Sequence, residues 1–155
     1  MRIDEIIDFL ESLGGVLVLR PTAGDGSPEI AWGDAFVYYA PDGVVPSVQP
    51  FATIVTKDYP DDTTSRLDRS GAFRLNIAAG SSEFRRWTGR GPRDPETEQV
   101  DRGEPDVLFA HPVYGELGWL AVVEPGPRTD AAVRELLRAA HALARGRHKR
   151  RAATD

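Results

Sequence analysis

His111 is the side chain in this sequence with the widest chemical range. An imidazole titrates near neutral pH and can act as a general acid or base; the other histidines, His141 and His148, come late in the chain. An acid–base site would pair His111 with a carboxylate such as Asp34 or Asp58. A histidine before a proline at the end of a predicted strand is also typical of a turn in which the ring binds the backbone. The sequence leaves both interpretations open.

A second group of polar side chains falls on predicted strands and on the turns beside them. Lys57 ends a predicted strand in a chain whose basic residues are otherwise nearly all arginine. If these side chains project from one sheet face, they form a polar pocket for an anionic small ligand. The alternative is an ordinary solvent-facing pattern, because antiparallel sheets often expose one face. The candidate ligand-binding residues are Tyr38, Lys57, Arg66, Arg74, Asn76 and His111.

Three acids, Asp58, Asp61 and Asp62, lie within one predicted turn. Carboxylate oxygens are ligands for hard cations, but the spacing lacks the alternating ligands and the closing glutamate of an EF-hand. We therefore predict no metal site and expect a solvated turn. Its charged residues would form ion pairs at the surface, namely Asp61, Asp62, Arg66, Asp68 and Arg69.

Several kinds of chemistry are excluded by residues or motifs that the sequence lacks. Without cysteine there is no disulfide, thiolate zinc site, iron–sulfur cluster or cysteine nucleophile. Ser81 and Ser82 have no G-x-S-x-G context, and neither a P-loop nor a G-x-G-x-x-G motif occurs. We predict no cofactor. The aromatic residues could stack on a ligand, but we favour core packing for them: Trp32, Trp87, Trp119, Tyr38, Tyr39 and Tyr114.

Length and charge indicate one acidic domain. The 155 residues fit a single domain, and a formal charge of −5 combined with a basic C-terminal segment makes the rest of the chain acidic. An acidic body argues against a broad phosphate-binding face, so we do not expect nucleic acid as the main partner. Acidic residues near the N-terminus do not fit a signal peptide, and no apolar run is long enough to span a bilayer. We expect a cytoplasmic protein without a membrane partner.

Hydrophobic spacing predicts the elements that must position these residues. Helical periodicity predicts a helix over residues 3–13, a short helix capped by Ser81 and a last helix capped by Thr129. Short apolar runs between turn residues predict strands at 16–19, 29–32, 36–39, 52–56, 73–77, 107–110 and 120–123. The second and third of these runs suggest a hairpin. Residues 73–77 alternate apolar and polar side chains, which predicts one wet face.

The order of these elements predicts an α+β fold. It consists of a single antiparallel sheet of about five to six strands, with the N-terminal, short middle and long C-terminal helices packed mainly on one face. Residues 1–146 would form the domain, and residues 147–155 a basic tail that frays. Residues 89–105, dense in Gly, Pro and charge, would form the longest irregular loop.

Three runs of the sequence resemble one uncharacterised bacterial family of domains of unknown function, DUF6194. They are residues 26–34, residues 50–58, and residues 111–115 followed by Gly118-Trp119. This likeness covers nearly the whole chain and implies no catalytic residues. The order of elements also resembles the MmcQ/YjbR-like fold, whose members are often labelled DNA-binding, although a fold does not determine a function.

Three functional hypotheses follow. The leading one is a non-enzymatic module that binds a small molecule or a protein through the polar sheet face or the loop 89–105. The second is an acid–base enzyme centred on His111, with an anionic small molecule held by Lys57 or Arg66. The third is weak DNA binding through the arginines of the last helix and the basic tail. The oligomeric state is left open.

Overall fold

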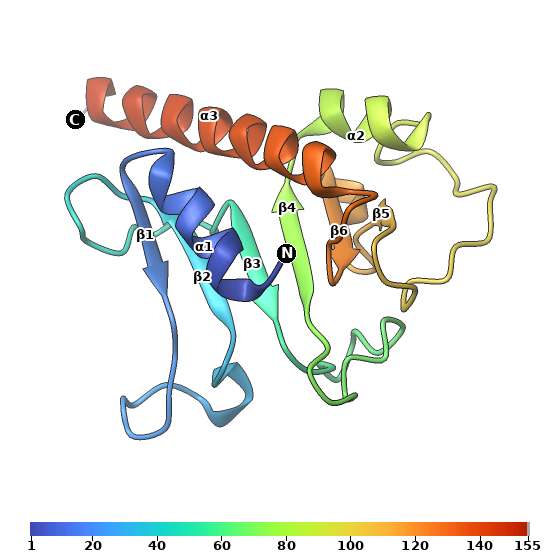
Figure 1. Cartoon of the computed structure of the whole chain (residues 1–155). Helices are drawn as coiled ribbons and strands as arrows, with labels where there is room; N and C mark the ends of the chain where they lie inside the picture. Colours follow the sequence, from blue (N-terminus) through green and yellow to red (C-terminus); the bar gives the residue numbers. More distant parts are fainter. Residues whose placement is uncertain (155) are drawn as a thin grey trace.

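Three helices and one six-stranded antiparallel sheet make up the computed structural model, which describes residues 1–154 (Figure 1). This confirms the predicted α+β class. In chain order the regular elements are α1 (Ile3–Ser12), β1 (Val16–Leu19), η1 (Glu29–Ala31), β2 (Ala35–Tyr39), β3 (Ala52–Val55), β4 (Arg74–Ala78), α2 (Ser81–Thr88), β5 (Leu108–Ala110), η2 (Gly115–Leu117), β6 (Trp119–Val123) and α3 (Asp130–Thr154).

The strand register sorts the side chains of the sheet into two faces. The strands lie in the order β1-β2-β3-β4-β6-β5, and all neighbours are antiparallel. Phe36 pairs with Thr53, which pairs with Asn76, so these three side chains form one row across the sheet. Val37 and Ala52 belong to the next row and point to the other face, because successive side chains of a strand alternate.

The helices cover the face that carries Val37 and Ala52. There the apolar sides of α1 and α3 pack with Phe84 of α2 against the sheet in one buried cluster. In α3, Val133, Leu136 and Leu137 are fully buried, in agreement with the helical periodicity of the sequence. Figure 1 shows α3 running along one end of the strands, with α1 beside it over β1 and β2. The main core therefore lies between the sheet and the helices.

The opposite face is partly covered by loops, which changes the expected environment of β4. A second apolar cluster joins Leu67 and Ala72, from the segment between β3 and β4, to Phe109, Ala121 and Val123 of the sheet. Beside it, Arg74 is 1% exposed and Asn76 2% exposed. The predicted wet face of β4 is therefore wrong: the strand alternates as expected, but its polar side chains are buried.

Three local predictions differ from the structure. Residues 29–32 form no strand, since Glu29–Ala31 is a 3-10 helix; β2 pairs with β1 and β3 instead. Ser81 is the first residue of α2, and the capping position falls on Gly80. Thr129 directly precedes α3, as predicted, and its carbonyl accepts the amide N–H of Val133, while its hydroxyl donates to Asp106. The last helix extends through the basic segment to Thr154, where strong helix formers such as Ala and Arg dominate.

None of the helices in residues 1–154 combines the length and the apolar character required to cross a bilayer.

Gly118 directly precedes β6, and its conformation offers a test of the fold. Its φ is +87°, and a Cβ there would lie 3.1 Å from the carbonyl carbon of Gly80. Gly43 also has a positive φ, +75°, but a Cβ at that position would meet no atom within 4 Å. We expect Gly43→Ala to lower the free energy of unfolding by about 1 kcal/mol and Gly118→Ala by at least about 2 kcal/mol, measured by urea denaturation. Equal losses would contradict the close approach to Gly80.

Candidate functional site

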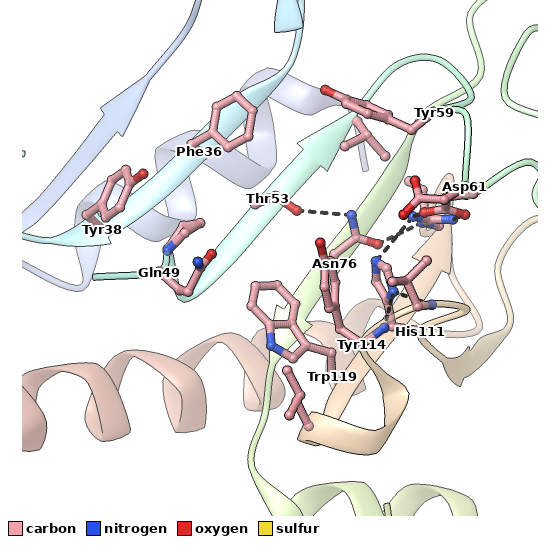
Figure 2. A pocket seen from close by; sticks show the side chains of 16 residues that line it. Phe36, Tyr38, Gln49, Thr53, Tyr59, Asp61, Asn76, His111, Tyr114 and Trp119 are labelled. Atoms are coloured by element: carbon pink, nitrogen blue, oxygen red, sulfur yellow. Dashed lines mark hydrogen bonds and ion pairs between the residues drawn. The ribbon is translucent and has the colours of Figure 1, made fainter. Parts of the chain in front are cut away.

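A cavity of about 450 Å³ lies on the sheet face opposite the helices. Its floor is the row of side chains from β2, β3 and β4 that contains Thr53 and Asn76, and one wall is the segment between β5 and β6 (Figure 2). Tyr114 and Leu117 of that segment are 49% and 69% exposed, so the cavity opens to solvent beside them. Its volume is in the range of small-molecule sites.

Aromatic side chains line much of this cavity. Phe36 and Tyr38 come from β2, and Tyr114 and Trp119 face them from the other side of the floor (Figure 2). The rings of Tyr114 and Trp119 lie 6.0 Å apart, centroid to centroid. Burial raises the pKa of Tyr38. The walls thus offer flat apolar surfaces with a few polar edges.

Arg74 organises the polar end of the cavity. Its Nε donates to Asn76 Oδ1 over 2.7 Å, and the Asn76 amide donates in turn to the Thr53 hydroxyl over 3.0 Å. Its Nη1 donates to Asp62 Oδ1 over 2.9 Å and to the Ser65 hydroxyl over 3.0 Å, while Nη2 donates to Asp62 Oδ2. The guanidinium is therefore held in one orientation by a two-point ion pair and two neutral partners.

His111 completes this end and has two roles. Its Nδ1 accepts the amide N–H groups of Val113 and Tyr114, both over 3.0 Å, so the ring closes the turn that follows. Its Nε2 lies 3.2 Å from Nη2 of Arg74, and the residue also lines the cavity. The interpretation as a turn histidine bound to the backbone is correct, and the same ring belongs to the candidate site.

The protonation states follow from burial and from the charge of Arg74. Burial, followed by the nearby guanidinium, lowers the pKa of His111 to about 3, although Asp62 acts in the opposite direction. Burial raises the pKa of Asp62, but hydrogen bonds from Arg74 and its charge outweigh this and lower it overall. At neutral pH the cluster thus holds a neutral imidazole beside an ionised pair.

Residues 1–153 match the model of a family of unknown function, DUF6194. The chain belongs to the DUF6194 family. This confirms the resemblance seen in the sequence. No curated protein and no solved structure matches the chain, so the likeness to the MmcQ/YjbR-like fold stays a prediction.

The cavity of this DUF6194 chain brings together four of the six candidate ligand-binding residues. Tyr38, Arg74, Asn76 and His111 line it. Lys57 instead donates to Asp34 and to the carbonyl of Trp32, both over 2.9 Å. Arg66 lies outside the cavity lining and pairs with Asp101 at the surface.

The expected carboxylate partners of His111 are both engaged elsewhere. Asp34 is fully buried and accepts from the amide and hydroxyl of Thr56, from Lys57 and from the hydroxyl of Tyr59. Burial and Asp34 raise the pKa of Tyr59. Asp58 accepts the amide N–H of Leu67. The predicted pairing of His111 with either acid is wrong, because both carboxylates accept their hydrogen bonds from other groups.

The turn between β3 and β4 also differs from the expected solvated network. Asp62 turns inward to Arg74, and Asp68 accepts the amide N–H of Asp58. Arg69 donates to backbone carbonyls rather than to an acid. Within residues 1–154, no three acidic or histidine side chains come together as a metal site would require.

Sequence reasoning missed Asp62 and Ser65 as site residues and misjudged the tryptophans. Asp62 and Ser65 reach Arg74 across 12 and 9 residues of chain, a loop closure that no local pattern reveals. None of the three tryptophans belongs to the buried core, and Trp119 lines the cavity. The useful signal was the alternation in β4, which places Arg74 and Asn76 on one face.

The lowered pKa of His111 predicts how stability depends on pH. The unfolded chain takes up a proton below the ordinary value of 6.5, whereas the folded chain resists it down to about 3. Stability is therefore complete above about pH 6.5 and falls as the pH decreases toward 3. Between pH 7 and 5 we expect the wild type to lose about 2 kcal/mol more than His111→Asn, measured by urea denaturation. Parallel profiles would contradict this.

The buried ion pair of Arg74 and Asp62 predicts strong coupling in a double-mutant cycle. Either Arg74→Met or Asp62→Asn should cost about 3–5 kcal/mol, because each leaves its partner's charge uncompensated. The double variant should lose less than the sum, by about 1–3 kcal/mol. The exposed pair of Arg86 and Glu135 is the matched control, with an expected coupling below about 1 kcal/mol. Similar coupling in the two pairs would argue against a buried role for Arg74.

Proposed function

We propose that this chain is a non-enzymatic binding domain that holds a small organic molecule in the cavity on the open sheet face. The observation that carries the proposal is the combination of aromatic walls with a buried, fixed polar end in one space of about 450 Å³. Small-molecule sites typically join an apolar lining to a few well-placed polar groups.

The polar end supports binding because it is organised in advance. Arg74 is 1% exposed, and its partners Asp62, Ser65 and Asn76 fix the guanidinium. A ligand would therefore meet donors already in place and would lose little affinity to ordering side chains. A protein partner would have to insert a side chain to reach the same groups.

The protonation of His111 supports binding over acid–base catalysis. A pKa lowered to about 3 makes the ring a weak base at neutral pH, where efficient catalysts have values close to the working pH. Within residues 1–154, no carboxylate forms a hydrogen bond with this ring. The acid–base and DNA-binding alternatives have no specific observation in their favour and stay predictions.

A thermal-shift screen with a library of small aromatic and alicyclic metabolites tests the proposal. A ligand at about ten times its Kd stabilises the folded state by about 1.4 kcal/mol, which raises Tm by roughly 3–6 °C in a chain of this size. Tyr38→Ala should remove most of the shift, because Tyr38 lines the cavity.

Trp87→Ala is the matched control for this screen. Trp87 is an aromatic residue of α2, 37% exposed, and does not line the cavity, so this variant should keep the ligand-induced shift. A library that stabilises neither protein, or shifts that survive Tyr38→Ala, would reject the proposed function.

A further inference from the structure

Both ring nitrogens of His111 face hydrogen-bond donors. Two backbone amides point at Nδ1, each over 3.0 Å, and a guanidinium nitrogen of Arg74 lies 3.2 Å from Nε2. A neutral imidazole has one N–H group and one acceptor nitrogen. Whichever ring nitrogen carries the hydrogen therefore faces a hydrogen-bond donor and cannot accept from it.

The partners decide which nitrogen carries the hydrogen. A hydrogen on Nδ1 would leave the amides of Val113 and Tyr114 without an acceptor. A hydrogen on Nε2 loses only the longer contact with Arg74. The hydrogen therefore lies on Nε2. Among the described residues, the Nε2–H group and the second hydrogen of Arg74 Nη2 then have no acceptor, and both groups belong to residues that line the cavity.

The charge of the lining argues against the anionic ligand expected from the sequence. The charged residues that line the cavity are Asp61, Asp62 and Arg74. Arg74 is neutralised by its two-point pairing with Asp62, His111 is neutral, and Asp61 adds a negative charge at the exposed side. A bound anion would meet a site with no net positive charge to offset its desolvation.

We infer that the ligand is an uncharged molecule with a flat apolar body and a hydrogen-bond-accepting oxygen, such as a carbonyl, which accepts from His111 Nε2 and Arg74 Nη2. The aromatic wall is adjacent, since the ring centroid of Tyr114 is 4.9 Å from that of His111 and the centroid of Trp119 is 6.2 Å from it. This inference rests on the proposed function and specifies the ligand class of the same cavity.

Three indole compounds with matched bodies test the ligand class on the full chain. Indole-3-acetamide is neutral with a carbonyl, indole-3-acetate is an anion, and tryptamine is a cation at neutral pH. Titration followed by NMR at millimolar concentrations should show the amide binding at least ten-fold more tightly than either charged compound, with shifts at Tyr114 and Trp119.

The other outcomes separate the inference from the proposed function. Tighter binding of the acetate or of tryptamine in the cavity overturns the inference and leaves the proposed function standing. Binding of none of the three also overturns it, and the metabolite screen then decides alone whether the cavity holds a ligand.

His111→Asn separates the two nitrogens of the ring. An asparagine oxygen can accept the amides of Val113 and Tyr114 as Nδ1 does, in an Asx-type turn, but offers nothing at the position of Nε2. We expect this variant to keep the fold and to bind indole-3-acetamide about five- to ten-fold more weakly, the loss of one hydrogen bond. Unchanged affinity would overturn the inference.

A measurement on the wild type covers the case in which the variant fails to fold. Long-range ¹H–¹⁵N NMR at neutral pH distinguishes the two neutral tautomers of a histidine. The ring of His111 should carry its proton on Nε2, and addition of indole-3-acetamide should shift that nitrogen. A proton found on Nδ1 would remove the basis of the inference.

Discussion

Arg74 carries a full charge at a position that is 1% exposed, and burying an unpaired charge costs several kcal/mol. The segment between β3 and β4 therefore has to fold back over the sheet, because only there can Asp62 and Ser65 supply the missing oxygens. Once in place, the same segment brings Leu67 onto Phe109 and Val123. One guanidinium thus determines the path of a loop, the second apolar cluster and the closed end of the cavity.

The two faces of the sheet have different roles: one carries the main core, and the other carries the cavity. The face under α1 and α3 is mainly apolar and supplies most of the hydrophobic stabilisation. That frees the other face to carry polar and aromatic side chains that would be costly in a single shared core. Phe36, Thr53 and Asn76 lie there in one row across neighbouring strands. Because the face packed against the helices is stable, the opposite face can keep a partly open cavity of the size of a small ligand.

The elements followed from local patterns, whereas the site depended on contacts between distant residues. Alternation placed Arg74 and Asn76 on one face, and this was enough to propose a polar surface. Alternation says nothing about burial, however. Asp62, twelve residues from Arg74 in the chain, turns inward to pair with it, and this contact makes the polar surface the closed end of the cavity. Lys57 and Arg66 were grouped with the site by residue type, although Asp34 and Asp101 hold them elsewhere. Chain order cannot show which acid a base will meet.

The shared ring of His111 has a consequence for the cavity mouth. The turn after it, through Tyr114 to Leu117, is closed by amides that donate to Nδ1, and an occupant that accepts from Nε2 further favours the tautomer in which Nδ1 is the acceptor. Occupancy and the local order of the rim are then thermodynamically linked. An occupied cavity would have a stiffer entrance than an empty one, so the bound molecule would itself slow its escape.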